Sequence, residues 1–248
     1  MFNFFVDIMP YENVYEITGK DYNHIKNVLR MKIGEQIIIS FNGKSDLCAI
    51  SRISDDKVYA EIIEKDFKDS ELPLEIYLFQ GLPKSDKMEL IIQKTVELGI
   101  SKVVPVEMKR CVVKLDEKKK NSKTARWQAI AESAAKQSKR NVIPTVSNVI
   151  TYKEFLEFAH ELDLLIVPYE NEKGMISTKE ALGKIKPGMK IGIFIGSEGG
   201  FEDGEIEAVK KIGADIVSLG KRILRTETAA ITTVSMLMLF CEMNFSGE

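Results

Sequence analysis

Three charged residues in the last quarter of the sequence have the types and spacing that acid–base and electrostatic catalysis require. Glu198 lies in the glycine-rich stretch GSEGG, and Arg225 and Glu227 lie in the stretch LGKRILRTETA. A carboxylate can accept a proton from a nucleophile, and an arginine can stabilise negative charge that develops during a reaction. Because an apolar run follows Glu227, a carboxylate at the N-terminus of a helix is an equally good interpretation of that residue.

Both stretches follow short apolar runs, at 191–196 and 215–220, that we expect to be buried strands. Glycine-containing turns at the carboxyl ends of parallel strands form ligand crevices, and their exposed backbone N–H and C=O groups can read an adenine and a ribose. Neither G-x-G-x-x-G nor G-x-x-x-x-G-K-[ST] occurs, which disfavours a dinucleotide or a triphosphate. The pattern therefore predicts an adenosine-like ligand recognised through the backbone, and the glutamates also tolerate a cationic one.

From residue 74 onward, expected strands alternate with expected helices, which predicts a mostly parallel α/β sheet. Apolar runs indicate strands at 74–80, 102–106, 164–168, 191–196 and 215–219. Helical spacing of apolar residues predicts helices at 85–98, 121–139, 177–182, 203–212 and 227–241. Within the last of these, VSMLMLFC is continuously apolar, so it suits a buried core helix as well as a surface that faces a dimer partner.

The first seventy residues show short β-like runs instead, separated by turns at Asn42-Gly43 and Asp55-Asp56. They predict a small antiparallel barrel with one helix at 21–31, capped by Asp21. The acidic stretch 65–73 separates this barrel from the region that follows.

Charge is uneven along the chain. The formal net charge is -2, yet residues 109–140 hold 11 basic and three acidic residues, a local balance of +8 that is typical of a polyanion-binding surface. The lysines of 118–123 are equally well explained as a solvated loop. The arginines at 110, 126 and 140 are better candidates, since a guanidinium binds phosphate with two hydrogen bonds. Trp127 could stack a base, but a core position is the favoured interpretation.

Several classes of protein are disfavoured by the composition. The chain of 248 residues has three cysteines, two histidines and no C-x-x-C, so we expect neither a disulfide framework nor a metal site. No apolar run approaches the roughly 18 residues that a membrane-spanning helix needs. No basic segment precedes an apolar one at the start of the sequence, as it would in a secretory signal. We therefore expect a cytoplasmic protein without a membrane segment.

The motifs match a known family. GSEGGFEDGEI and VSLGKRILRTETAA closely resemble the RsmE family of the SPOUT superfamily, whose members methylate N3 of a uridine in 16S ribosomal RNA. HIKNVLRMKIGEQI resembles the PUA-like barrel of that family, and LPKSDKMELIIQKTVELGI, PVEMKRCVVK and RWQAIAESAAKQSKRNVIP resemble the start of its methyltransferase domain. Ser197 departs from the family, which usually has proline there, so the rigidity of that turn is open.

The resemblance implies a SPOUT methyltransferase domain with a mostly parallel sheet and a C-terminal trefoil knot at 74–248, and a PUA-like RNA-binding β-barrel at 1–70. It also implies a homodimer, 16S ribosomal RNA as the substrate, and S-adenosylmethionine as the cofactor. The expected cofactor residues are Pro168, Gly196, Ser197, Gly199, Gly200, Leu219, Gly220, Ile223, Leu224 and Thr228. Motif position and charge assign RNA contacts to His24, Arg30, Lys84, Arg110, Arg126, Gln137 and Arg140, although His24 and Arg30 also suit a solvated helix surface.

Uracil N3 is a poor nucleophile until it loses its proton, so methylation requires a base or a cation that stabilises the uracil anion. We expect Arg225 to supply this stabilisation, and Glu198 or Glu227 to receive the proton directly or through water. Two other classes remain open: an RNA-binding protein without catalysis, and an α/β enzyme that uses another adenosine-containing cofactor. The intact LGKRILRTETA disfavours the first of these.

Overall fold

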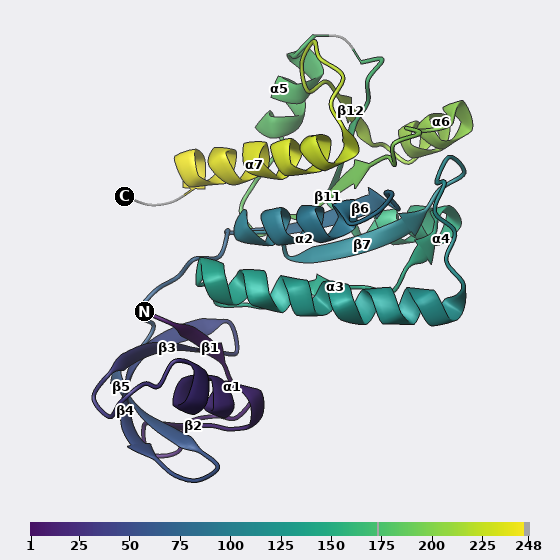
Figure 1. Ribbon diagram of the computed structural model, residues 1–248. Helices are drawn as coiled ribbons and strands as arrows, with labels where there is room; N and C mark the ends of the chain where they lie inside the picture. Colours follow the sequence, from purple (N-terminus) through teal and green to yellow (C-terminus); the bar gives the residue numbers. More distant parts are fainter. Residues whose placement is uncertain (173, 246–248) are drawn as a thin grey trace. The chain divides into compact units, whose positions relative to one another are not determined.

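The computed structural model describes residues 1–172 and 174–245, so residues 173 and 246–248 of the expected domain 74–248 lie outside the described part (Figure 1). The chain divides into two compact units. Unit 1 comprises Met1–Glu71 together with Ala135–Ile143, and unit 2 comprises Leu72–Ala134 and Pro144–Glu248.

Unit 1 is a curled five-stranded sheet, a half-barrel with the strand order β1-β3-β4-β5-β2. Its strands are β1 (Asn3–Phe5), β2 (Val14–Ile17), β3 (Gln36–Phe41), β4 (Lys44–Ile53) and β5 (Val58–Glu64). Asn42 and Gly43, both at positive φ, form the expected turn between β3 and β4. The strands pair in the expected antiparallel way except at one edge of the sheet, where β1 pairs with β3 in parallel.

The helical segment of unit 1 begins earlier than expected, with α1 (Gly19–Asn23) followed by the π-helix η1 (His24–Val28). Thr18 is the N-cap residue, so the prediction that Asp21 caps this helix is wrong. Asp21 lies inside α1, where its Oδ1 accepts a hydrogen bond from Lys136 Nζ at 2.9 Å. Ile25 of η1 is fully buried in the core of the half-barrel with Phe4 and Ile37.

A later segment, 135–143, completes unit 1. The Arg140 guanidinium is buried and pairs with Glu71, whose Oε1 also accepts the Asn141 N–H at 2.8 Å. The Arg140 carbonyl accepts a hydrogen bond from Asn3 Nδ2 at 2.9 Å. This ion pair between a buried arginine and a partly exposed glutamate, with its additional hydrogen bonds, ties the segment to the half-barrel.

Unit 2 is the expected α/β fold, with a sheet of order β12-β10-β11-β6-β7-β8 in which every pairing is parallel and β9 pairs with β7. Its strands are β6 (Glu75–Gly81), β7 (Lys102–Glu107), β8 (Thr145–Val146), β9 (Ile150–Thr151), β10 (Leu164–Pro168), β11 (Lys190–Ile195) and β12 (Asp215–Val217). Its helices are α2 (Lys87–Glu97), α3 (Glu117–Ser138), α4 (Tyr152–Phe158), α5 (Ile176–Gly183), α6 (Asp203–Lys211) and α7 (Thr226–Phe245), with a short 3₁₀ turn η2 (Ala159–Glu161); the end of α3, from Ala135, belongs to unit 1.

Helices cover both faces of this sheet because neighbouring residues of a strand point to opposite sides. In β6, the Phe79 ring lies 4.9 Å from the Phe155 ring of α4, whereas the next residue, Gln80, bonds to Thr226 of α7. Helix α4 and the short strands β8 and β9 were not predicted from the sequence. Trp127 of α3 is buried, as favoured.

Helix α7 packs against α2, β6 and β11 (Figure 1). Val234, Leu237 and Cys241 are buried, which confirms the core interpretation for one face, while Leu239 and Met243 on the other face are half or more exposed. Among the described residues, α7 alone is long and apolar enough to span a bilayer, a test that buried core helices also pass. The trefoil knot stays a prediction.

Candidate functional site

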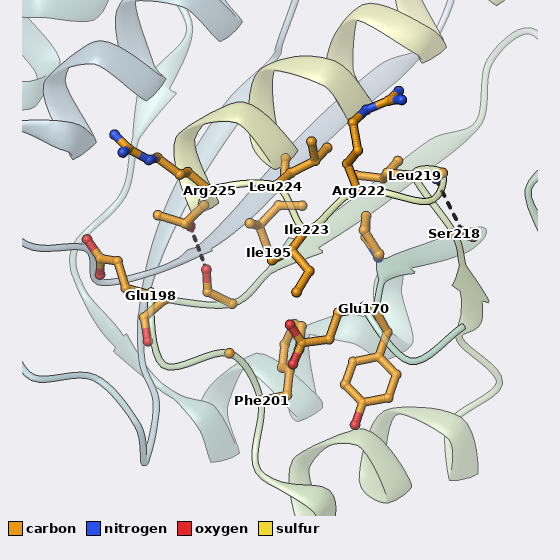
Figure 2. A pocket seen from close by; sticks show the side chains of 18 of the residues that line it. Glu170, Ile195, Glu198, Phe201, Ser218, Leu219, Arg222, Ile223, Leu224 and Arg225 are labelled. Carbon is orange, nitrogen blue, oxygen red and sulfur yellow. Dashed lines mark hydrogen bonds between the residues drawn. The ribbon is translucent and has the colours of Figure 1, made fainter. Parts of the chain in front are cut away.

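A cavity of about 480 Å³ lies where β10, β11 and β12 end and α7 begins (Figure 2). Three segments form its walls, at 168–170, 195–201 without Gly199, and 218–226, and Lys87 and Ala229 complete the lining. Its volume suits a small-molecule ligand. Of the expected cofactor residues, Gly199 and Thr228 do not line the cavity; those that do are Pro168, Gly196, Ser197, Gly200, Leu219, Gly220, Ile223 and Leu224.

The first wall is a tight turn at the end of β11. The Gly200 N–H donates to the Ser197 carbonyl at 2.9 Å, and Gly200 has φ +65°, a conformation that favours glycine. A Cβ on Gly199 would lie 2.8 Å from the Arg110 carbonyl oxygen. The bond that closes the turn uses the backbone carbonyl of residue 197, which serine supplies as well as proline does.

The second wall is the loop between β12 and α7. Thr178 of α5 donates to the Ser218 carbonyl at 2.7 Å, and its hydroxyl accepts the Ser218 N–H at 3.2 Å, so α5 fixes the start of this loop. Farther along, Ile223 lines the cavity while 85% of the residue remains exposed. An exposed apolar side chain beside a cavity offers packing surface to a flat ring.

A buried polar contact joins the glycine turn after β11 to the start of α7. The Thr226 hydroxyl donates to the Gly196 carbonyl at 2.6 Å, and Gln80 Nε2 donates to the same hydroxyl at 2.9 Å. Gln80 is fully buried, and its Oε1 has no hydrogen-bond partner among the described residues. The first turn of α7 is thereby held in register with the glycine turn.

A cluster of charged side chains lies beside the cavity. Lys87 Nζ is 3.0 Å from Glu198 Oε1 and 3.2 Å from Glu227 Oε2. Partial burial works against the charged form of Glu198, but hydrogen bonds from its own backbone N–H, from Lys87 and from the Lys84 N–H outweigh it. The pKa of Glu198 is therefore lowered, and the hydrogen bond to Glu198 raises the pKa of Lys87. Both side chains are charged at neutral pH.

Arg225 and the two glutamates occupy different positions around this cavity. Arg225 is exposed and lines the cavity, and its guanidinium has no hydrogen bond or ion pair to the described residues. Figure 2 shows the Arg225 and Glu198 side chains extending to the same side of the pocket. Glu227 does not line the cavity, and its Oε2 is buried.

Several residues that line the cavity were not among the predicted site residues, including Lys87, Tyr169, Glu170, Phe201 and Arg222. A signal existed for two of them, because Tyr169 and Glu170 directly follow the expected strand 164–168 and so lie at the same sheet edge as the glycine turns. No local signal distinguished Lys87 from the other lysines near the start of α2.

The expected RNA residues are dispersed. In unit 2, Lys84 and Arg110 are exposed beside the glycine turn, since the Lys84 N–H donates to Glu198 and Arg110 Nη1 donates to the Gly199 carbonyl at 3.3 Å. Arg126 is exposed but pairs with Glu89 at 2.8 Å.

In unit 1, Arg30 and Gln137 are exposed, and the His24 ring packs edge-on to Phe4 with centroids 6.2 Å apart. Arg140 is buried with Glu71, so its side chain anchors the segment 135–143 and does not reach the surface that RNA would contact.

Comparisons with known proteins agree with this geometry. An RNA methyltransferase domain family matches residues 70–238, and an RNA methyltransferase PUA domain family matches residues 17–63. Ribosomal RNA small subunit methyltransferase E from Bacillus subtilis is 40% identical over 90% of this chain and 89% of its own length. The protein of the same name from Mesomycoplasma hyopneumoniae is 36% identical over 93% of this chain and 96% of its own.

Solved structures are similar over almost the whole chain. A ribosomal RNA small subunit methyltransferase E from Neisseria gonorrhoeae, bound to S-adenosylmethionine, matches with a TM-score of 0.81 and 32% identity over 96% of this chain and 97% of that one. A Legionella pneumophila protein in complex with the same cofactor has a TM-score of 0.82 and 30% identity over the same shares. The chain belongs to the ribosomal RNA small subunit methyltransferase E family, an RNA methyltransferase family.

Proposed function

We propose that this protein uses S-adenosylmethionine to methylate N3 of a specific uridine in small-subunit (16S) ribosomal RNA. The observation that carries the proposal is the cavity at the ends of β10, β11 and β12, beside which lie the ion-paired Glu198 and Arg225, a cation without an ion pair to the described residues. Its residues suit the cofactor: Ile223 and Leu224 offer apolar surface to an adenine, the glycine turn exposes backbone groups, and the Glu170 carboxylate suits hydroxyl or cationic groups.

The residues of this site have distinct tasks in the proposed reaction. The cavity residues would hold S-adenosylmethionine, which would supply an activated methyl group for uracil N3, with the electron pair of the broken carbon–sulfur bond left on sulfur. Arg225 faces the carbonyl oxygens of the uracil and stabilises the anion that forms when the N3–H bond breaks. The walls of the cavity align the reacting atoms and exclude water.

The geometry favours Glu198 over Glu227 as the group that receives the proton, directly or through water. Glu198 lines the cavity and keeps acceptor capacity on Oε2, whereas Glu227 Oε2 is buried outside it. Since the pKa of Glu198 is lowered, the carboxylate is a weak base and passes the proton on to solvent. Most of the rate acceleration must then come from stabilising the uracil anion.

Calorimetry with three adenosine-containing ligands tests the cofactor assignment. We expect S-adenosylmethionine to bind with one site per chain, and NAD and ATP to give no saturable heat, because the sequence has neither of the two glycine-rich motifs that bind their phosphates. Saturable binding of NAD or ATP without binding of S-adenosylmethionine would identify a different α/β enzyme.

The two parts of the chain have separate proposed roles, with residues 1–70 as an RNA-binding PUA-like domain and residues 74–248 as the methyltransferase domain. The match of residues 17–63 to an RNA methyltransferase PUA domain supports the first role. In unit 2, Lys84 and Arg110 beside the glycine turn are the proposed contacts to the RNA backbone near the reacting base. That base must be extruded from folded RNA to reach the cavity.

The double variant Lys84→Ala with Arg110→Ala is expected to weaken binding to a small-subunit RNA fragment while S-adenosylmethionine still binds normally. Loss of two phosphate contacts should reduce the slope of log K against log salt by about 1 to 2. Lys153→Ala is the control, because this α4 lysine has an 87% exposed side chain whose ion pair among the described residues is with Glu157 of its own helix. An unchanged slope in the double variant would remove these residues from the RNA interface.

We also propose that the protein is a cytoplasmic homodimer that pairs through the exposed face of α7. An apolar groove on this face supports the pairing, lined by Leu182, Ile231, Thr232, Ser235, Met236, Leu239, Phe240 and Met243. Burial of such a face against a second copy would remove it from water. We propose the C-terminal trefoil knot as well, because the family resemblance implies it.

A further inference from the structure

Lys87 is placed where a second positive group, besides Arg225, could act in the reaction, and its two ion-pair partners come from outside its own helix. It lies in the first turn of α2, yet its ammonium reaches the glycine turn after β11 and the first turn of α7. The side chain is 30% exposed and lines the same cavity as Arg225. It is thus a cation at the wall where the uracil is proposed to bind.

The contacts of Lys87 leave it able to donate to a substrate. An ammonium group has three N–H donors, and here they face two carboxylates, Glu198 and Glu227. Glu227 Oε2 is buried and accepts no well-aligned hydrogen bond from the part of the chain that the structure describes, although Lys87 Nζ is 3.2 Å away. Glu227 is therefore a counter-ion that neutralises Lys87. At least one N–H of Lys87 is left to donate to a substrate bound in the cavity.

We infer that Lys87 is a further catalytic residue, whose ammonium donates a hydrogen bond to a carbonyl oxygen of the target uracil and stabilises its anion together with Arg225. When the N3–H bond breaks, the negative charge spreads over N3 and the two carbonyl oxygens. A fixed cation beside one of these oxygens lowers the energy of the anion more than that of neutral uracil. This inference rests on the proposed reaction and adds a residue to it.

The charged groups that face Lys87 fix the sign of the expected pH effect. They are Glu198 from the glycine turn, Glu227 from α7 and, at the same cavity, Arg225. Removing Lys87 removes a positive charge and leaves two carboxylates, and both changes disfavour the uracil anion. The acidic limb of the kcat against pH profile, which reports formation of this anion, must then move to higher pH.

The experiment compares Lys87→Met with the double variant Lys87→Met/Glu227→Gln. The single variant leaves the Glu227 carboxylate buried without its counter-ion and can unfold for that reason alone. The double variant removes both charges, so its melting temperature and S-adenosylmethionine affinity should stay close to those of the wild-type protein. We expect its kcat to fall by about 10²-fold and its acidic limb to move up by about one pH unit.

Each outcome decides the question. Recovery of wild-type kcat and pH profile in the double variant would show that Lys87 only neutralises Glu227, and would overturn the inference. So would a kcat lowered equally at every pH, which indicates loss of geometry. Product analysis of the wild-type enzyme is the separate control: if it forms no N3-methyluridine, the proposed reaction itself fails, whatever the variants do.

Discussion

Replacing Arg225 with alanine will lower kcat for methyl transfer by about 10²–10³-fold, the usual effect of removing one group that stabilises transition-state charge. Arg225 is exposed at the cavity, and its guanidinium has no hydrogen bond or ion pair to the described residues, so its removal leaves no partner unsatisfied. The melting temperature and the affinity for S-adenosylmethionine should therefore stay nearly unchanged. Single-turnover kinetics with labelled cofactor, together with calorimetry, measure the two effects separately.

Two further variants serve as controls for that result, one conservative at the same position and one at a distant exposed charge. Arg225→Lys keeps the charge but loses the planar fork of donors, so its kcat should lie between those of the wild-type protein and Arg225→Ala. Lys211→Ala removes an exposed charge at the end of α6 and should leave kcat unchanged. If Arg225→Ala kept the wild-type kcat, the proposed electrostatic role would be wrong.

Gly81→Ala is expected to abolish tight binding of S-adenosylmethionine, although Gly81 itself does not line the cavity. A Cβ on Gly81 would lie 2.7 Å from the Ser197 backbone nitrogen and 2.6 Å from Met108 Sδ. Methionine can move, but the backbone nitrogen begins the glycine turn, so the turn must shift. We expect a loss of about 1–3 kcal/mol in the free energy of unfolding, as for overpacking elsewhere, and a larger relative loss of cofactor affinity.

Gly204→Ala is the matched control, because a Cβ there meets nothing within 4 Å and the residue lies in α6. Alanine is the better helix former, so stability should stay equal or rise by up to about 1 kcal/mol. Chemical denaturation and calorimetry on both variants measure the difference. Normal cofactor affinity in Gly81→Ala would show that the position of the glycine turn does not matter for binding.

The parallel sheet and its glycine turns were predictable because their signals are local. Apolar runs such as 164–168 and 191–196 coincide closely with β10 and β11, and a glycine next to such a run marks the end of a strand. The capping box of α4, with Thr151 and Glu154, was also readable in the sequence. That helix was overlooked because it spans only seven residues.

Features that depend on distant partners could not be predicted in this way. The parallel pairing of β1 with β3 is a tertiary choice between short strands, and no periodicity specifies it. Arg140 was predicted to be a surface cation because the glutamate that pairs with it, Glu71, lies 69 residues away in the sequence. The position of Lys87 at the cavity could not be predicted for the same reason, since the two carboxylates that pair with it, Glu198 and Glu227, come from separate segments. Charge alone does not tell whether a basic residue faces solvent or a buried acid.

The most direct test of the proposed function is mass mapping of modified nucleosides in ribosomal RNA from cells with and without this protein. We predict one N3-methyluridine in 16S RNA that disappears when the protein is removed. It should return when the wild-type protein is restored, but only in trace amounts with Arg225→Ala. An N3-methyluridine content of 16S RNA that is the same in both kinds of cell would contradict the account.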